Sequence, residues 1–358
     1  MSQINLQELV KDRIKSLKAY HVDNFDTEIK LHANENSYPL APDLIEVFRD
    51  QIGKLTLNRY PDPECGALKD IIAKRLNVST EQLVIGNGSD ELLQLLVQVF
   101  CDPGEAILFP DPTFAMYGLI ARGLGVKPVA FPLNEEWDFE AETLLQTIEE
   151  HNPRILFFSY PNNPTGNCFN PGEILKVLER YEGLVVLDEA YYDFAKSTFL
   201  PEMARHSNLV ILRSLSKIGL AGLRVGYGVA PAAVVSEINK IRLPYNSNMV
   251  SQVFSEAVLS RFHLVEEQIG VIIEERHRLQ DQLGKIPGIT AFRSDANFIL
   301  FRTAIDSSRV FQKLAQGGIL VRDLGGHPRL KNCLRVTVGM PGENNRFLET
   351  LGGVMQTD

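Results

Sequence analysis

The chain has 358 residues, which is too long for one ordinary hydrophobic core and favours two packed domains. Hydrophobic residues make up 44% of the sequence and charged residues 23%, which is the profile of a soluble globular protein. The net charge of −9, from 36 basic and 45 acidic residues, argues against nucleic acid or an anionic membrane as the main partner.

The start of the sequence and the spacing of its cysteines favour a cytoplasmic protein. Residues 1–18 alternate charged and apolar side chains and contain no apolar core of the kind that a signal peptide needs. No apolar stretch is long enough to span a bilayer. The four cysteines lie far apart without a CxxC pair, so we expect neither a metal site nor a disulfide framework.

Short, uniformly apolar runs recur through the middle of the chain and alternate with helical patterns, such as those over residues 91–100 and 172–181. Such runs are typical of strands that are buried on both faces of a mostly parallel sheet. The predicted strands span residues 82–85, 106–109, 155–158, 184–187, 209–212 and 225–229. We therefore expect a doubly wound α/β fold in a large domain over residues 45–240.

The pattern changes after Pro244. Residues 250–282 form one long helical pattern. Shorter predicted strands follow at residues 289–293, 297–302, 318–322 and 333–338. Helices on a small sheet predict a second, α+β domain over residues 241–358, and we expect residues 1–44 to pack on it or on a partner chain.

Polar motifs follow nearly every predicted strand of the large domain. In open α/β sheets, ligands bind beyond the carboxyl ends of the strands, so these motifs predict a site there. The first strand leads into Gly86-Asn87-Gly88-Ser89-Asp90-Glu91, where the glycines allow a tight turn and a helix N-terminus can hold a phosphate. A plain helix cap with acids in its first turn is the alternative interpretation of Ser89 and Asp90.

Lys217 is the most informative residue, in the motif Ser214-Leu215-Ser216-Lys217 directly after a predicted strand. An amine beside two hydroxyls, with Arg224 seven residues later, is the set that a pyridoxal phosphate Schiff base requires. An arginine fork suits the cofactor phosphate. The alternative is a surface lysine after a strand, with serines that cap a helix.

Asp188 follows the apolar run over residues 184–187. An acid at the tip of a buried strand is costly unless it meets a cation, and a pyridinium nitrogen is such a cation. A carboxylate at this place keeps the ring protonated and makes it a better electron sink. Tyr191, three residues later, could hydrogen-bond the ring hydroxyl. A metal-binding or helix-capping aspartate is the alternative.

Two further loops carry candidate ligands of a planar ring. Phe114 follows the strand over residues 106–109 and could stack on such a ring, contributing roughly 1 kcal/mol, although an aromatic residue there is more often part of the core. The loop Pro161-Asn162-Asn163-Pro164-Thr165-Gly166 is rigid and can aim an amide at a ligand, with a plain turn as the alternative.

Together these motifs resemble the fold-type I pyridoxal phosphate aminotransferases of class I and II, over nearly the whole chain. The matching stretches are PNNPTG at 161–166, DEAY at 188–191, SLSK at 214–217 and AGLRVGY at 221–227. More narrowly, the sequence resembles the histidinol-phosphate aminotransferases within that class. That resemblance depends on the compact length and on residues 31–38, 58–62, 321–328 and 333–339.

The resemblance implies a role for each matching residue. Lys217 would form the Schiff base with pyridoxal 5'-phosphate and then shuttle a proton, and Asp188 would pair with the pyridine nitrogen. Asn163 and Tyr191 would hold the ring oxygen. The residues that would surround the cofactor phosphate are Ser89, Asp90, Ser214, Ser216 and Arg224.

The resemblance also implies the substrate site and the assembly. Arg335 would bind the acid group of the incoming substrate, with Arg322 and Tyr38 assigned to the same site. Tyr60 would reach the cofactor phosphate of the neighbouring subunit in a homodimer. The family usually has tyrosine where Phe114 stands, so stacking is kept and a hydroxyl contact is lost.

The expected activity is the transfer of an amino group between L-histidinol phosphate and 2-oxoglutarate, in L-histidine biosynthesis and without a metal. Two alternatives share the same motifs: an aromatic amino acid aminotransferase, and a pyridoxal phosphate decarboxylase of a phosphorylated amino acid. A binding protein that keeps the fold without catalysis is a further alternative. The intact set of Lys217, Asp188 and Arg224 argues against that alternative.

The family commonly places the phosphate arginine eight residues after the lysine, and the step here is seven.

Overall fold

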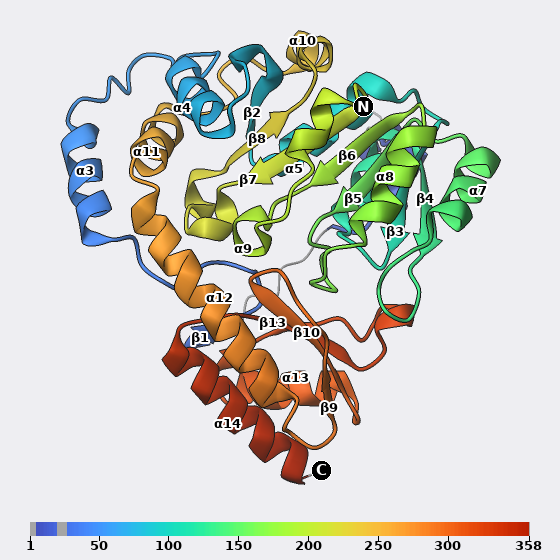
Figure 1. Cartoon of the computed structure of the whole chain (residues 1–358), viewed down its shortest axis with the longest axis vertical. Coiled ribbons are helices and arrows are strands. Elements are labelled where there is room, and N and C mark those ends of the chain that lie inside the picture. Colours follow the sequence, from blue (N-terminus) through green and yellow to red (C-terminus); the bar gives the residue numbers. More distant parts are fainter. Residues whose placement is uncertain (1–4, 20–26, 358) are drawn as a thin grey trace.

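The computed structural model describes residues 5–19 and 27–357 (Figure 1). A seven-stranded sheet forms the upper part of the view and a four-stranded sheet the lower part. The strands are β1 Ile29–Lys30, β2 Leu83–Asn87, β3 Ala106–Asp111, β4 Lys127–Pro132, β5 Ile155–Ser159, β6 Leu184–Asp188, β7 Leu209–Ser214, β8 Val225–Val229, β9 Ile289–Ala291, β10 Phe298–Thr303, β11 Ile319–Leu320, β12 Arg322–Asp323 and β13 Cys333–Thr337. The helices are α1 Leu6–Leu9, α2 Asp12–Lys15, α3 Pro42–Ile52, α4 Gly66–Leu76, α5 Ser89–Phe100, α6 Met116–Leu124, α7 Ala141–His151, α8 Pro171–Arg180, α9 Tyr192–Ala195, α10 Ala232–Ile241, α11 Met249–Leu259, α12 His263–Leu283, α13 Ser307–Gln316 and α14 Pro341–Thr357.

The large sheet has the strand order β2-β8-β7-β6-β5-β3-β4. Strand β8 runs antiparallel to both of its neighbours, and the other pairs are parallel. The prediction of a mostly parallel, doubly wound sheet is therefore confirmed. Because β8 runs in the opposite direction, its first residue lies at the edge where the parallel strands end.

Strands β2, β3, β5, β6 and β7 of the large sheet send alternate residues into two different cores. On β6, Val186 belongs to the core that includes side chains of α5, α6 and α10. Its neighbours Val185 and Leu187 belong to the core on the other face, with side chains of α7 and α8. This second core continues into the smaller sheet, so one apolar interior joins the two sheets.

The smaller sheet has the order β12-β13-β10-β9 with antiparallel pairs. Strand β1 pairs in parallel with β11, which ties the N-terminal segment to the last third of the chain. Helix α11 packs on α3 and α4, whereas α12 packs on α14 and on β9. No helix in the described ranges is both long and apolar enough to cross a membrane.

Three expectations about individual elements were wrong. Strand β4 was not predicted, because it lies at the edge of the sheet and alternates exposed and buried residues. The single pattern over residues 250–282 is two helices, α11 and α12, separated by a short turn that the hydrophobic pattern does not mark. The strand predicted over residues 318–322 is two short strands, β11 and β12, that pair in different sheets.

Candidate active site

A cavity of about 310 Å³ lies at the carboxyl edge of the large sheet, where it meets the N-terminal segment and the smaller sheet. Most of the site residues predicted from the sequence line it together. They are Ser89, Asp90, Phe114, Asn163, Asp188, Tyr191, Ser214, Ser216, Lys217, Arg224, Arg322 and Arg335. Motifs from six strands of the large sheet and two strands of the smaller sheet therefore converge on one space.

Asp188 is the last residue of β6 and is 4% exposed. The Tyr117 hydroxyl donates to its Oδ2 at 3.1 Å, and the Ala190 backbone N–H donates to Oδ1 at 3.2 Å. Burial raises the pKa of Asp188 to about 7, and the nearby negative charge of Asp90 acts in the same direction. A positive ligand in the cavity would reverse that cost and keep the carboxylate ionised.

Lys217 lies on a 3-10 turn, Ser216–Ile218, directly after β7. Its Nζ donates to the Ala33 carbonyl at 3.4 Å and lies 5.8 Å from the centroid of the Tyr191 ring. The Ala33 contact is long and weak, so the amine is available for a stronger interaction in the cavity.

The anion-binding part of the cavity is formed by the N-terminus of α5 and by Arg224. The Arg224 guanidinium lies 3.4 Å from Ser216 Oγ and 3.4 Å from Asp90 Oδ2. A side chain at Gly226 would meet the Ser89 backbone nitrogen at 2.2 Å, so only glycine allows β8 to approach the turn this closely. Free N–H groups at a helix N-terminus and an arginine fork together favour a phosphate.

The direction of β8 brings Arg224 to this place. Two successive 3-10 turns, Ser216–Ile218 and Ala221–Leu223, carry the chain from β7 to β8. Arg224 then adopts a left-handed conformation, with φ of 53°, immediately before β8 begins. The seven-residue step from Lys217 thus still delivers the arginine to the cavity.

The two asparagines of the loop over residues 161–166 have different surroundings. Asn162 is fully buried, and it accepts a hydrogen bond from Thr113 Oγ1 at 2.6 Å and donates to the Pro112 carbonyl at 3.0 Å. These bonds tie the loop to the segment that carries Phe114. Asn163 instead lines the cavity, where its Oδ1 accepts from Arg335 Nη1.

Arg335 and Arg322 lie opposite each other on the paired strands β13 and β12. Arg335 Nη2 donates to the His32 carbonyl at 2.8 Å. Burial lowers the pKa of the His32 imidazole; the negative charge of Glu35 opposes this shift, and the positive charges of both arginines add to it. This part of the cavity therefore favours an anion.

Comparison with known proteins agrees with this geometry. Residues 26–351 match the family model of class I and II aminotransferases. The chain belongs to this family. Its relatives include "Histidinol-phosphate aminotransferase 2" of Nitrosococcus oceani, 40% identical over 98% of both chains, and the histidinol-phosphate aminotransferase of Aquifex aeolicus, 40% identical over 96% of this chain and 97% of the relative. The crystal structure of histidinol-phosphate aminotransferase from Sinorhizobium meliloti in complex with pyridoxal-5'-phosphate shares the fold, with a TM-score of 0.88, 23% identity and coverage of 100% and 98%.

The cavity of this aminotransferase fits pyridoxal 5'-phosphate on its own chemistry. The buried Asp188 needs a cation, and a protonated pyridine nitrogen is one. The Gly88–Ser89 turn and Arg224 suit a phosphate, and the Lys217 amine is free of a close partner among the described residues. No three metal-ligating side chains gather anywhere in the part of the chain that the structure describes.

Two of the predicted site residues do not line the cavity of this chain. Tyr60 is 78% exposed, and its ring stacks on Tyr245 with the centroids 4.4 Å apart. Tyr38 is half-buried, and its backbone N–H donates to Asn36 Oδ1 at 2.9 Å.

Two residues that line the aminotransferase cavity, and one that contacts its Asp188, had no predicted role. Asn34 is buried and donates through Nδ2 to the Tyr191 hydroxyl at 2.9 Å. His32 lines the cavity beside the two arginines. Tyr117 is fully buried, stacks on Phe157 with centroids 5.0 Å apart, and contacts Asp188. The first two lie in the motif that carried the narrower resemblance, and Tyr117 lies one helical turn after Phe114.

Proposed function

We propose that this aminotransferase uses pyridoxal 5'-phosphate to move an amino group between L-histidinol phosphate and 2-oxoglutarate, giving imidazole-acetol phosphate and L-glutamate in L-histidine biosynthesis. The observation that carries the proposal is the pairing of Arg322 with Arg335 at the cavity that also contains Lys217. Guanidinium groups bind both phosphates and carboxylates, which are the anions of the two substrates. The names of the relatives support the same substrate.

When bound, the cofactor supplies an electron sink for the bonds at the carbon that carries the amino group. Lys217 would hold it covalently until the amine of the substrate replaces the lysine, and the freed Nζ would then take up and return a proton. The Asp188 carboxylate keeps a proton on the ring nitrogen, since a buried anion stabilises the cation beside it. Asn163 and Tyr191 would hold the ring oxygen, and Phe114 would pack on the ring.

The other predicted site residues at the edge of the large sheet would hold the cofactor phosphate. The N-terminus of α5 contributes Ser89 and Asp90, and the turn after β7 contributes Ser214 and Ser216. Arg224 supplies the positive charge. Arg335 would then bind the substrate anion, with Arg322 beside it. Because amino donor and acceptor use this one site in turn, we expect ping-pong kinetics.

We also propose a homodimer in which Tyr60 completes the neighbouring subunit's phosphate site. The support is a set of exposed apolar side chains on the segment that carries Tyr60 and on the segment that carries its stacking partner Tyr245, because exposed apolar surface is typical of an interface. They are Leu57 at 71%, Tyr60 at 78%, Leu243 at 72% and Tyr245 at 41% exposure.

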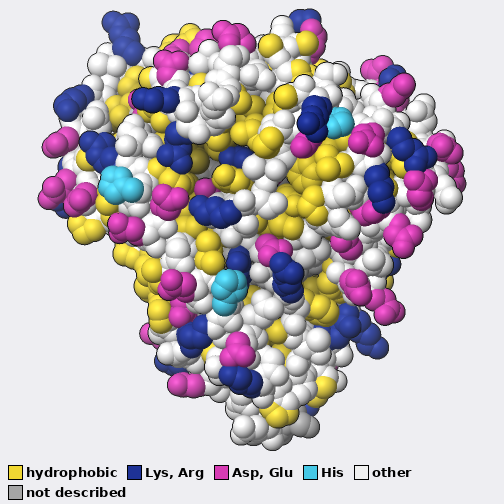
Figure 2. Space-filling view, viewed as in Figure 1, with side chains coloured by type: hydrophobic (Ala, Val, Ile, Leu, Met, Phe, Trp, Pro, Cys, Tyr) yellow, Lys and Arg dark blue, Asp and Glu magenta, His cyan; other side chains and the backbone are white. Residues whose placement is uncertain are grey.

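The same proposal includes the division into an N-terminal segment, a large domain and a small domain at residues 1–44, 45–240 and 241–358. It also includes a cytoplasmic location, which the four free cysteines support. Acidic and basic side chains are interspersed over the face in Figure 2, an arrangement suited to small-molecule substrates rather than a polyanion.

The test is the activity of the purified protein on three substrates. We expect turnover of histidinol phosphate with 2-oxoglutarate to exceed transamination of phenylalanine and decarboxylation of threonine phosphate. The assay measures glutamate, phenylpyruvate and carbon dioxide separately. Faster reaction of phenylalanine would instead identify an aromatic aminotransferase, and release of carbon dioxide a decarboxylase.

A further inference from the structure

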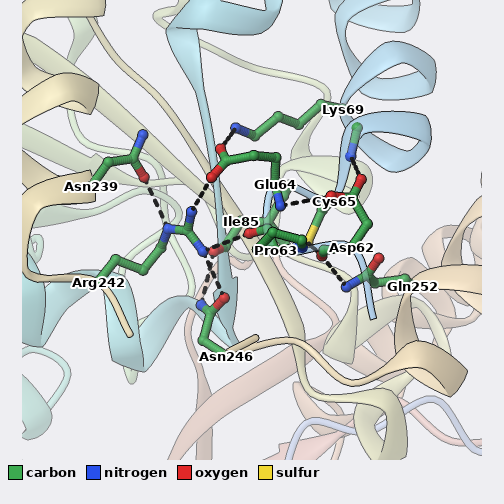
Figure 3. Close-up of polar contacts among 11 residues, drawn as sticks. Asp62, Pro63, Glu64, Cys65, Lys69, Ile85, Asn239, Arg242, Asn246 and Gln252 are labelled. Carbon is green, nitrogen blue, oxygen red and sulfur yellow. Dashed lines mark hydrogen bonds and ion pairs between the residues drawn. The ribbon is translucent and has the colours of Figure 1, made fainter. Parts of the chain in front are cut away.

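The segment that carries Tyr60, residues 53–65 between α3 and α4, is held at its base by polar contacts (Figure 3); we call it the Tyr60 loop. Gln252 Nε2 donates to the Asp62 carbonyl at 2.9 Å. Arg242 Nη1 donates to the Pro63 carbonyl at 3.1 Å, and Arg242 Nη2 lies 3.4 Å from Glu64 Oε1. The exposed tip of the loop is thus built on a fixed base.

Arg242 is the central residue of these contacts. Its side chain is only 6% exposed, although it lies just after α10 at the molecular surface. Besides the Tyr60 loop, it donates through Nε to Asn239 Oδ1 at 2.9 Å and through Nη1 to Asn246 Oδ1 at 3.0 Å. A guanidinium with so little exposure depends on all these partners to offset its lost hydration.

Asn246 extends the contacts in the opposite direction, toward the cavity. Its Nδ2 donates to the Ile85 carbonyl at 3.1 Å and to Glu91 Oε2 at 2.7 Å. The same Glu91 oxygen accepts from the Asn87 backbone N–H at 2.6 Å. Asn87 ends β2 and directly precedes Gly88 and Ser89, which line the cavity at the start of α5.

One side chain therefore joins two structures that the proposed function uses. Asn246 accepts a hydrogen bond from the arginine that holds the Tyr60 loop, and it donates to the turn that begins the phosphate-binding helix. We propose that Arg242 and Asn246 are positioning residues that couple the phosphate turn of one subunit to the Tyr60 loop that completes the site of its partner. This inference rests on the homodimer of the proposed function.

Coupling of this kind follows from the shared hydrogen bonds. A shift of the phosphate turn changes the position of Asn246, and Arg242 must follow or lose a bond to its acceptor. In the dimer, the consequence is that cofactor retention in one subunit depends on Asn246 of both chains. If Asn246 acted only within its own subunit, cofactor retention in that subunit would depend on Asn246 of that chain alone.

The test uses heterodimers isolated with two different affinity tags. One subunit carries Lys217→Ala, so the visible absorbance of lysine-bound cofactor comes only from the other, reporter subunit. Asn246→Ala is then placed on either subunit, and timed gel filtration measures how fast the reporter loses cofactor. We expect a faster loss by at least about fivefold in both placements, because the variant removes the bonds to Arg242, Ile85 and Glu91 and the loss of one such bond is enough for that change. Lys240→Ala, an exposed change at the end of α10, is the matched control and should stay within twofold in both placements.

A second variant separates the bond of Asn246 to Arg242 from its bonds to Ile85 and Glu91. It also serves as the test if Asn246→Ala fails to fold. Asn246→Asp keeps an acceptor for Arg242 but loses the donor to Ile85 and Glu91. On the reporter subunit it should still accelerate cofactor loss, whereas on the silent subunit it should restore the unmodified rate. Two outcomes would overturn the coupling. One is that Asn246→Ala on the silent subunit leaves the rate of cofactor loss within twofold of that of the unmodified heterodimer. The other is that Asn246→Ala and Asn246→Asp on the silent subunit change this rate equally. A chain that sediments as a monomer overturns the dimer itself, and that result is known before any rate is measured.

Discussion

The two sides of the cavity are built by different means. On the side of the large sheet, each polar residue lies where a strand ends or begins, as Asp188 does on β6, Lys217 after β7 and Arg224 before β8. On the other side, the residues come from distant parts of the chain. Arg335 contacts the His32 carbonyl across 303 positions of sequence, and the Asn34 N–H donates to Thr337 Oγ1 across the same separation.

This difference suggests that one side of the cavity holds the cofactor and the other side binds the substrates. The ends of buried strands are held by the core of the sheet, so they suit a cofactor that stays in place through the whole cycle. The second side depends on packing between separate segments, and it suits a substrate that enters and leaves. Substitutions on the first side should therefore affect the cofactor and both half-reactions. Substitutions on the second side should affect the substrates and leave cofactor retention unchanged.

Lys217→Ala tests the first side most severely. We expect it to abolish turnover, because no other amine lies at the end of β7 to take up the proton. The variant should still bind cofactor through the phosphate site, without the visible band of a lysine adduct. Steady-state kinetics and absorbance spectra check both points, with Lys240→Ala as the control. Normal turnover would refute the assignment of Lys217.

Asp188→Asn should lower turnover on the order of 100-fold or more while the protein stays folded. The amide fits the same space but carries no charge to keep the ring nitrogen protonated. Both half-reactions should slow together, as stopped-flow absorbance can show, and circular dichroism checks the fold. A change of less than threefold would mean that Asp188 does not pair with the ring.

Arg335→Lys tests the second side of the cavity. The lysine keeps the charge but loses the two-pronged guanidinium. The transition state of each half-reaction should therefore be less stable by roughly 1–3 kcal/mol relative to free enzyme and substrate. Cofactor retention should not change, which distinguishes this variant from those on the first side. Half-reaction kinetics with glutamate and with histidinol phosphate measure the effect. Arg302→Lys, an exposed position on the adjacent strand β10, is the control. Unchanged kinetics with both substrates would place the anion site elsewhere.

The raised pKa of Asp188 makes a further prediction for the cofactor-free protein. The folded pKa is about 7, whereas an unfolded aspartate titrates near ~3.9, so the folded state binds the extra proton between these values. The contribution of Asp188 to the free energy of unfolding therefore falls as pH rises from about 4 to about 7. Asp188→Asn does not titrate, so its stability relative to the unmodified protein should rise by roughly 1–3 kcal/mol over that window. Urea unfolding at several pH values measures this difference, and a difference independent of pH contradicts it.

The sequence located the first side of the cavity far better than the second. Asp188 and Lys217 follow uniformly apolar runs, so their place at the edge of the sheet could be predicted without a structure. His32 and Asn34 could not be assigned in this way, because their contacts depend on segments about 300 positions away. The reversed direction of β8 was also hidden, since a buried strand has the same composition in either direction. The edge strand β4 was missed because its exposed residues break the apolar run.

Tyr117 was hidden for another reason, and it gives the mildest test of the first side. A fully buried aromatic residue on α6 has the pattern of a core residue, and Tyr117 does stack on Phe157 and meet the Phe114 ring edge-on at 5.6 Å. Its hydroxyl also donates to Asp188 Oδ2. Tyr117→Phe keeps the packing and removes that bond, so the carboxylate becomes less stable and the pKa of Asp188 rises further.

Two measurements should respond to Tyr117→Phe. The dissociation constant of the cofactor should rise by about fivefold, the effect of roughly 1 kcal/mol, because the anion that faces the ring nitrogen is less well held. In the cofactor-free protein, the pH at which stability stops falling should move upward, since the folded pKa of Asp188 sets that limit. Tyr181→Phe removes another buried tyrosine hydroxyl, which donates to the Pro153 carbonyl at 2.8 Å away from the cavity. Tyr181→Phe should lower the free energy of unfolding but should change neither the dissociation constant of the cofactor nor the pH at which stability stops falling. If Tyr117→Phe behaved like Tyr181→Phe, Tyr117 would act only in the core, and Asp188 would keep its position through the Ala190 N–H and the strand alone.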